Sequence, residues 1–531
     1  MLDVLIYDTT LRDGSQGEGI SLSVEDKIKI ARKLDFLGVS YIEGGWPGSN
    51  PKDMAFFQAM RDYPWENAKL SAFSFTRKAG VRVQDDIIMK SLLESGVKVA
   101  TLVGKSWDFH VLRALETTLE ENLSMVGESI AYLKDKGFEV FFDAEHFFDG
   151  YKRNPDYALQ VLETAAQAGA DCLVLCDTNG GCMPWEIAQI INQVRSRSTA
   201  PLGIHTHNDS ACAVSNSLIA VQNGCVQVQG TINSYGERCG NADLCSIIPN
   251  LELKMDLKCL PDGKLKHLTE VSHYVSEIAN MPGSNNQPFV GYGAFAHKAG
   301  IHVSALLKDS LTYEHINPEA VGNHRRVLVS ELAGLSNLQY KAQELGIDIN
   351  KYSDETKQLT KKIKELENDG YQFEGADASL ELLLRKAFNQ YEDYFQLKNL
   401  KIILEKTVDN EIISEAMIKL AIGSEIVHTA AEGDGPVNAL DNSLRKALYD
   451  VYPEINEMHL TDYKVRVLNG QEATAAKVRV LIESSDQHEK WTTVGVSENI
   501  IEASYQALVD SINYMMMKRQ LFAERTKRLE A

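Results

Sequence analysis

The sequence predicts an α/β protein whose first half is a (β/α)8 barrel followed by a helical connector and a small α+β domain. Over about the first 235 residues, short apolar runs alternate with longer amphipathic stretches. There are eight apolar runs, and most amphipathic stretches are followed by a glycine shortly before the next run. Glycine at that place is typical of a helix C-terminus. Eight strands that alternate with helices fit a closed parallel barrel.

The predicted elements follow one another in a regular order. The strand candidates are residues 2–8, 39–45, 69–75, 97–103, 138–145, 171–177, 201–207 and 226–233. Helical patterns between them include residues 24–37, 83–95, 119–136, 156–168, 184–194 and 211–223. A doubly wound open sheet is the competing architecture, and it predicts a glycine-rich phosphate loop after the first strand. Residues 11–17 do not match such a loop, so the barrel is favoured.

Three domains are expected: a barrel over residues 1–260, a connector over 261–395 and a C-terminal domain over 396–531. The connector looks helical and irregular. In the last domain, residues 438–443 recur as residues 499–504, and each copy opens an amphipathic helix. Strand-like runs precede the two copies at residues 416–428 and 475–482. This duplicated strand–strand–helix unit predicts pseudo-twofold symmetry, which either forms a ligand crevice or reflects packing alone.

Composition excludes several classes of protein. The net charge of −20 argues against a nucleic-acid or anionic-membrane binder, because phosphates attract basic surfaces. No apolar stretch is long enough for a transmembrane helix, and the N-terminus lacks a secretory pattern, so we expect a cytoplasmic protein. None of the eight cysteines forms a Cys-x-x-Cys pair. We therefore expect reduced thiols rather than disulfides or structural zinc.

Polar side chains gather at the predicted C-terminal ends of the barrel strands. Because these ends converge on one face of a barrel, the side chains are expected to share a site. They are Arg12, Asp13, Glu43, Glu145, Thr178, His205, His207 and Asn233.

His205 and His207 are two residues apart on a strand, so both imidazoles point to the same side. With Asp13 they suit a divalent metal that acts as a Lewis acid, and Asn241 is a candidate neutral ligand. The alternative for the histidine pair is two hydrogen-bonded core side chains.

Arg12 suits a substrate carboxylate or a developing oxyanion. Its alternative role is a structural ion pair with Asp8, Glu43 or Glu145, and the two roles can coexist.

A metal that chelates an α-keto acid makes the ketone carbon electrophilic. A base is then needed to form a carbon nucleophile. The residues alone do not rank the candidates, which are Glu145, His146, His297, His302 and Tyr313.

Four motifs together resemble the metal-dependent acyl-CoA Claisen condensation enzymes of the DRE-TIM metallolyase superfamily. This family includes 2-isopropylmalate, homocitrate and citramalate synthases. The motifs are residues 8–14, 205–209, 236–241 and 297–302, and the resemblance extends to residues 432–437. Residues 43–53, 142–150 and 493–497 are similar to the (R)-citramalate synthase branch. That branch condenses pyruvate with acetyl-CoA and water to give citramalate and CoA, toward isoleucine through 2-oxobutanoate.

The resemblance implies roles for individual residues. Metal binding, of Mn2+, Mg2+ or Zn2+, is implied for Asp13, His205, His207 and Asn241. Binding of the keto acid is implied for Arg12 at its keto oxygen and for Thr178 at its carboxylate. Proton transfer from the acetyl methyl group is implied for Glu145 and His302, with Tyr313 nearby.

Regulation and assembly are implied in the same way. In relatives the connector reaches the partner subunit's active site, which implies a homodimer that exchanges the segment carrying His302. The C-terminal domain resembles the regulatory domain of the family, with isoleucine as the expected inhibitor. The implied effector-binding residues are Gly433, Asp434, Gly435 and Pro436. Residues 469–474 depart from the compact turn of the branch, which bears on effector binding and not on catalysis.

Three alternatives stay open at this point. One is 2-isopropylmalate synthase of leucine biosynthesis, which would prefer 2-oxoisovalerate as acceptor. Another is a lyase that cleaves a hydroxy-acyl thioester on the same barrel, although such relatives usually lack a regulatory domain. The last is a non-catalytic sensor, which the complete set of polar strand-end residues argues against.

Overall fold

The computed structural model describes residues 2–330, 334–347, 349, 353–406, 408, 411–468 and 476–530. They form two compact units. The first contains the chain up to Phe295 together with His315–Arg325, and the second contains Ala296–Glu314 and the chain from Arg326 onward. Each unit is described by itself.

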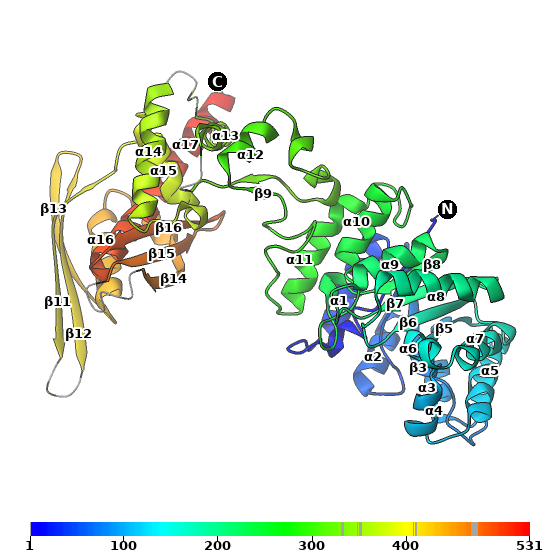
Figure 1. The fold of residues 1–531 in the computed structure, drawn as a ribbon. Helices are drawn as coiled ribbons and strands as arrows, with labels where there is room; N and C mark the ends of the chain where they lie inside the picture. Colours follow the sequence, from blue (N-terminus) through cyan, green and yellow to red (C-terminus); the bar gives the residue numbers. More distant parts are fainter. Residues whose placement is uncertain are drawn as a thin grey trace. The chain divides into compact units, whose positions relative to one another are not determined.

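The first unit is a closed barrel of eight parallel strands in sequential order, as predicted (Figure 1). Strand β1 pairs with both β2 and β8, so the first and last strands close the barrel. The strands are β1 (Leu5–Asp8), β2 (Tyr41–Glu43), β3 (Lys69–Phe75), β4 (Val99–Lys105), β5 (Glu139–Glu145), β6 (Cys172–Asp177), β7 (Leu202–Thr206) and β8 (Cys225–Gly230).

Helices connect the strands and continue after β8. Helix α1 begins at a capping box of Ser23 and Asp26 and ends at Gly38, whose φ of 97° requires glycine. The helices are α1 (Val24–Leu37), α2 (Pro51–Met60), α3 (Ile87–Glu94), α4 (Asp108–Arg113), α5 (Leu119–Asp135), α6 (Phe147–Arg153), α7 (Pro155–Gln167), α8 (Pro184–Arg197), α9 (Ala213–Gln222), α10 (Leu244–Lys254) and α11 (Leu268–Ile278).

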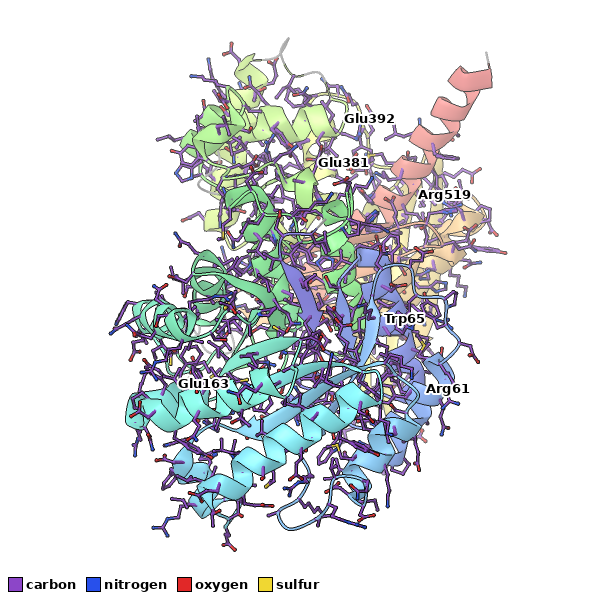
Figure 2. All side chains as sticks on the ribbon, turned by 90° about the vertical axis from the view of Figure 1, so that its right-hand side faces the viewer. Arg61, Trp65, Glu163, Glu381, Glu392 and Arg519 are labelled. Carbon is purple, nitrogen blue, oxygen red and sulfur yellow. The ribbon has the colours of Figure 1, made fainter. Side chains whose placement is uncertain are left out.

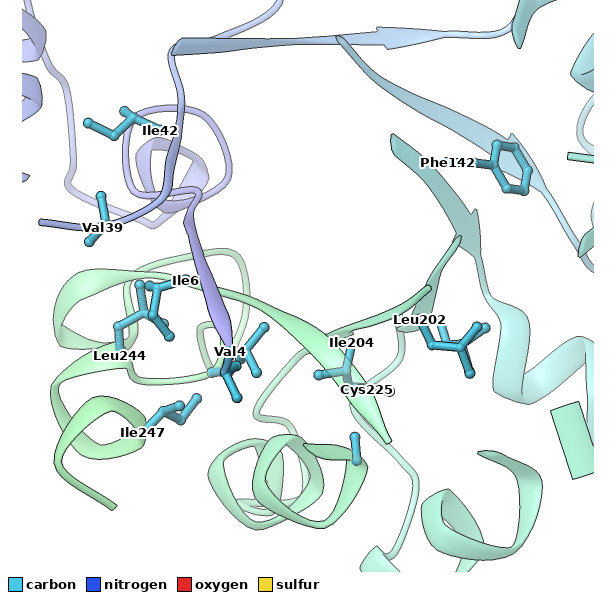
Figure 3. Close-up of a cluster of buried hydrophobic side chains, with 14 of the residues drawn as sticks. Val4, Ile6, Val39, Ile42, Phe142, Leu202, Ile204, Cys225, Leu244 and Ile247 are labelled. Atoms are coloured by element: carbon cyan, nitrogen blue, oxygen red, sulfur yellow. The ribbon is translucent and has the colours of Figure 1, made fainter. Parts of the chain in front are cut away.

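Alternate strand residues face two different environments. Ile6, Ile42 and Ile204 are fully buried in the large apolar cluster between strands and helices, part of which Figure 3 shows. Tyr7 and Phe141 belong to a separate buried cluster. Successive strand residues point to opposite faces, so these side chains are the ones expected to fill the barrel interior. Charged side chains such as Glu163 on α7 are exposed outside (Figure 2).

The second unit starts with the connector elements. Strands β9 (Ala296–His297) and β10 (Arg326–Val327) form a small parallel pair. The other elements are helical, as predicted: α12 (Gly300–Leu306), α13 (Leu335–Glu344), α14 (Ser353–Asn368) and α15 (Asp377–Ala387).

The C-terminal part contains two similar antiparallel sheets, each followed by a helix, which confirms the predicted duplication. The first copy comprises β11 (Gln396–Lys406), β12 (Ile412–Ile422), β13 (Glu425–Gly433) and α16 (Pro436–Leu448). The second comprises β14 (His459–Val467), β15 (Val478–Ser485), β16 (Lys490–Ser497) and α17 (Ile500–Glu530).

Each copy has three strands rather than the two predicted. The run at 416–428 covers parts of β12 and β13, which are joined by a turn that contains Gly423. Residues 469–474 and residue 475, where the second predicted run begins, lie outside the described residues.

Within the described part of the chain, every helix is too short or too polar to cross a membrane.

Candidate active site

Three of the four predicted metal ligands meet at the C-terminal end of the barrel. Asp13 lies in the turn after β1, His205 lies on β7, and His207 directly follows that strand. The Nε2 atoms of the two histidines are 3.3 Å apart. Asp13 Oδ2 is 3.3 Å from His205 Nε2 and 4.0 Å from His207 Nε2. One ligand atom from each residue therefore fits around a single ion.

Asn241, which lies beside His207, buries polar atoms that a metal ion would satisfy. Both polar atoms of the Asn241 side chain have no hydrogen-bond partner among the described residues, and neither does His207 Nδ1, the ring nitrogen opposite the Nε2 that faces Asp13. Asn241 is fully buried, and its backbone bridges that of His207. A buried unpaired polar group costs about 1–3 kcal/mol, so such groups are normally satisfied. Two imidazoles, a carboxylate and an amide oxygen fit a divalent cation.

Electrostatics favour the ligand forms of two of these side chains. Burial alone would raise the pKa of Asp13, but the Arg12 guanidinium and His205 hold that pKa well below its usual range. Asp13 is therefore a carboxylate at neutral pH. Burial, together with the charge of His205, lowers the pKa of His207 to about 3, so its imidazole is neutral.

Arg12 is fixed beside the cluster by a buried carboxylate and an aromatic ring. Its Nε donates to Glu43 Oε2 at 2.6 Å, and its guanidinium lies 4.2 Å from the centre of the Phe73 ring. Nη1 lies 3.4 Å from Asp13 Oδ1. Of the three ion-pair partners expected from the sequence, the structure selects Glu43.

A buried tyrosine holds Glu43 from the opposite side. Tyr7 donates to Glu43 Oε1 at 2.9 Å, and its hydroxyl is 2.6 Å from Thr101 Oγ1. Sequence reasoning missed Tyr7, which looks like an ordinary residue of an apolar strand. Asp8 instead accepts hydrogen bonds from the backbone and hydroxyl of Thr10, and burial raises its pKa to about 7.

Glu145 ends β5 and forms an ion pair with Lys105 at the end of β4. Sequence reasoning also missed Lys105, because it ended the fourth strand at residue 103. Both side chains line a cavity of about 350 Å³, whose other walls include Val103 and Met125. The carboxylate therefore borders a space that can admit a substrate.

Thr178 is tied to the loops around the site. Its hydroxyl accepts from the backbone of His146 at 2.9 Å, and its carbonyl accepts from Arg238 at 2.8 Å. Asn233 differs from expectation, because its amide donates to Ser272 and Ser276 on α11 and does not reach the metal ligands.

Comparison with known proteins places the chain in one family. Residues 3–275 match the HMGL-like family, residues 289–371 match the homocitrate synthase post-HMGL domain-like family, and residues 374–516 match the LeuA allosteric (dimerisation) domain. The (R)-citramalate synthase of Geobacter sulfurreducens is 56% identical over 97% of this chain and 98% of its own length. That of Aquifex aeolicus is also 56% identical, over 97% of this chain and 98% of its own. The chain belongs to the (R)-citramalate synthase family.

The 2-isopropylmalate synthase of Methanocaldococcus jannaschii is more distant. It is 33% identical over 97% of this chain and 95% of its own length. The full-length match within the (R)-citramalate synthase family disfavours the lyase, the sensor and the 2-isopropylmalate synthase alternatives.

In this (R)-citramalate synthase family member, His302 and Tyr313 belong to the second unit. His302 is exposed and its ring stacks on that of Tyr313, with centres 4.2 Å apart. Nearby in sequence, His297 Nε2 lies 3.3 Å from Glu314 Oε1. His302 and Tyr313 are thus neighbours within the second unit.

The four expected effector residues form the turn between β13 and α16. The backbone N–H of Asp434 donates to Asn438 Oδ1 at 3.1 Å. A Cβ at Gly433 would lie 2.4 Å from the backbone nitrogen of Ala439, so the close approach of strand and helix requires glycine. Gly435 has extended backbone, and a Cβ there would meet no atom of the described residues within 4 Å.

Proposed function

We propose that this chain catalyses the Claisen-type condensation of acetyl-CoA with pyruvate and water to give (R)-citramalate and CoA, leading toward isoleucine through 2-oxobutanoate. The 56% identity to (R)-citramalate synthases over almost the full length of both chains carries this proposal. The cluster of Asp13, His205 and His207 supports it, because the chemistry needs an activated ketone.

Asp13, His205 and His207 would hold a divalent metal, Mn2+, Mg2+ or Zn2+, with Asn241 completing the set. A metal held there supplies Lewis-acid polarisation of the keto acid. Arg12 binds the keto oxygen and stabilises the negative charge that develops on it, since its guanidinium is already fixed by Glu43. Thr178 binds the carboxylate of pyruvate.

Glu145 acts as the base in the proposed reaction. It removes a proton from the methyl group of acetyl-CoA, and the resulting carbon nucleophile forms a bond to the keto carbon of pyruvate. The C=O π bond opens to an alkoxide, which takes up a proton to become the hydroxyl group of citramalate. His302, with Tyr313 beside it, assists proton transfer. Water then cleaves the thioester, which releases CoA thiol and the second carboxylate of citramalate. Glu145 suits this role because its side chain lines the cavity of about 350 Å³ at the end of β4 and β5.

The C-terminal domain is proposed to bind isoleucine as a feedback inhibitor. The match to the LeuA allosteric (dimerisation) domain supports both a homodimer and allosteric regulation. The effector site would include the turn from Gly433 to Pro436. In the dimer, the segment that carries His302 and Tyr313 would enter the partner's active site.

One assay tests the proposed reaction. CoA thiol release from acetyl-CoA is measured with pyruvate, 2-oxobutanoate, 2-oxoisovalerate and 2-oxoglutarate, after chelation and after return of each metal. We expect strong preference for pyruvate, dependence on metal and inhibition by isoleucine but not leucine. Preference for 2-oxoisovalerate would replace the proposal by 2-isopropylmalate synthesis. Cleavage of citramalyl-CoA without condensation, seen by NMR, would indicate a lyase.

A further inference from the structure

A chain of two hydrogen bonds leads from His205 into the barrel interior. Its Nδ1, on the far side of the ring from Asp13, is 2.9 Å from Gln229 Oε1. Gln229 Nε2 donates to Asp143 Oδ1 at 3.0 Å. The three residues come from β7, β8 and β5, and each is at least nine-tenths buried. None of the roles assigned above uses Gln229 or Asp143.

When Asp143 is a carboxylate, the order of donors and acceptors in this chain has one consistent direction. The Asp143 oxygen accepts, so the amide NH2 of Gln229 faces it. The carbonyl oxygen of Gln229 must then face His205, and it can accept only from a protonated Nδ1. With the proton on Nδ1, Nε2 is the ring atom that faces Asp13 and His207, and in the neutral imidazole its lone pair is free to bind a metal.

We propose that Gln229 and Asp143 are positioning residues that hold His205 in the Nδ1-protonated tautomer, with Nε2 aimed at the metal. The proposal rests on the metal site of the proposed function. Metal-binding histidines commonly donate their second N–H to such a partner, which fixes the ring and strengthens the ligand. An amide orients the ring without adding a third carboxylate beside Asp13.

A second buried glutamine on β8, Gln227, can be compared with Gln229 in its hydrogen bonding. Gln227 lies two residues before Gln229, so both side chains point to the same face of β8. Gln227 is 1% exposed, and neither of its side-chain polar atoms has a hydrogen-bond partner among the described residues. Burial in the barrel alone therefore does not force a glutamine into a hydrogen-bonded chain.

The test measures metal binding directly rather than turnover. Full-length protein is stripped with chelator and titrated with Co2+, followed by calorimetry and by the visible absorption of the bound ion. We expect Gln229→Leu to weaken Co2+ binding about 10- to 100-fold and to change the absorption spectrum. The matched control Gln227→Leu is expected to bind within about twofold of wild type, with an unchanged spectrum.

Further variants keep the proposal falsifiable if Gln229→Leu does not fold. Asp143→Asn keeps an acceptor oxygen for Gln229 and is expected to bind Co2+ within about threefold of wild type, whereas Asp143→Leu is expected to lose about tenfold. Gln229→Glu alone brings two buried carboxyl groups together and is expected to weaken binding about tenfold. In the double variant Gln229→Glu with Asp143→Asn, the new amide donates to the carboxylate at position 229, so Co2+ binding is expected to return toward that of wild type.

Two results overturn the proposal in different ways. Equal Co2+ affinity and spectra for wild type, Gln229→Leu and Asp143→Leu, or equal losses in Gln229→Leu and Gln227→Leu, exclude the positioning role but leave the metal site intact. If His205→Ala binds Co2+ as wild type does, the metal site itself is wrong, and the positioning role and the proposed mechanism fail together.

Discussion

The barrel interior and the C-terminal sheets treat buried polar groups in opposite ways. The barrel buries ionisable side chains, among them Asp13, Glu43 and Asp143. In the described residues from 396 onward, the buried polar side chains are those of Ser, Thr and Asn, and the core is apolar around residues such as Leu440 and Ile482. Charged contacts there, such as that of Arg519 with Glu457 (Arg519 is labelled in Figure 2), lie nearer the surface.

This difference shows what each region is built to do. Buried charges cost several kcal/mol each unless they are paired, and the barrel meets that cost with ordered contacts such as Tyr7–Glu43–Arg12. The resulting dry, fixed charges suit catalysis. The C-terminal domain keeps its core apolar and leaves polar backbone at the turns before its helices, which suits reversible binding of a small effector.

The largest expected effect comes from removing a metal ligand. His205→Ala should lower pyruvate-dependent thiol release by more than about a hundredfold, because the remaining ligands hold the metal less tightly. Circular dichroism and isoleucine binding to the C-terminal domain should stay as in wild type. Full activity in this variant would show that the barrel's buried charges serve structure alone.

Arg12→Lys should come next. Lysine keeps the charge but loses the planar fork that bonds Glu43 and faces the substrate, so we expect kcat to fall about a hundredfold with a smaller change in KM. Steady-state kinetics with pyruvate as the varied substrate measure both constants. A rise in KM alone would mean that Arg12 binds the ground state and does not stabilise developing charge.

Substitutions in the C-terminal region should change inhibition by isoleucine and leave basal activity unchanged, which is the reverse of the barrel variants. Gly435→Val has room in the structure, so it should leave melting temperature and basal kcat unchanged while raising the half-inhibitory isoleucine concentration about tenfold. Gly433→Ala is the contrasting variant, because its methyl group meets the start of α16 and should lower the melting temperature as well. Unchanged inhibition in Gly435→Val would place the effector elsewhere.

The smallest effect concerns pH and Asp8. Burial raises the pKa of this carboxyl to about 7, above its unfolded value, so the folded state retains a proton that the unfolded state has lost between about pH 4 and 7. Stability from this group is therefore present at low pH and is lost as pH rises through 7. Asp8→Asn should flatten this dependence and gain about 2–3 kcal/mol at pH 8 relative to pH 5 in urea unfolding. Parallel pH curves for the two proteins would contradict the assignment.

The sequence predicted the barrel because its signals are local. Gly38, Gly96 and Gly137 all adopt positive φ after helices, and the apolar runs that follow them are largely buried strands. The spacing of two residues between His205 and His207 is also a local signal, because such residues point to the same side of a strand. Asp13, His205 and His207 could be grouped because strand ends converge in this fold.

Other features depend on contacts that no local pattern reveals. Strands β11 and β14 were missed because most of their residues are exposed or half-buried on both faces, which removes the alternation of apolar and polar residues. Gln229 and Asp143 sit inside predicted strands, and only the closed barrel brings them together. For the same reason Lys105 could not be paired with Glu145.

The pairing of β1 with β8 has a consequence for synthesis of the chain. Asp13 follows the first strand, whereas His205 lies on the seventh and His207 directly follows it, and β8 lies between these strands in the closed barrel. About 190 residues therefore separate the ligands in sequence. On the ribosome, the proposed metal site would therefore form only after the last strand has been synthesised and has paired with β1.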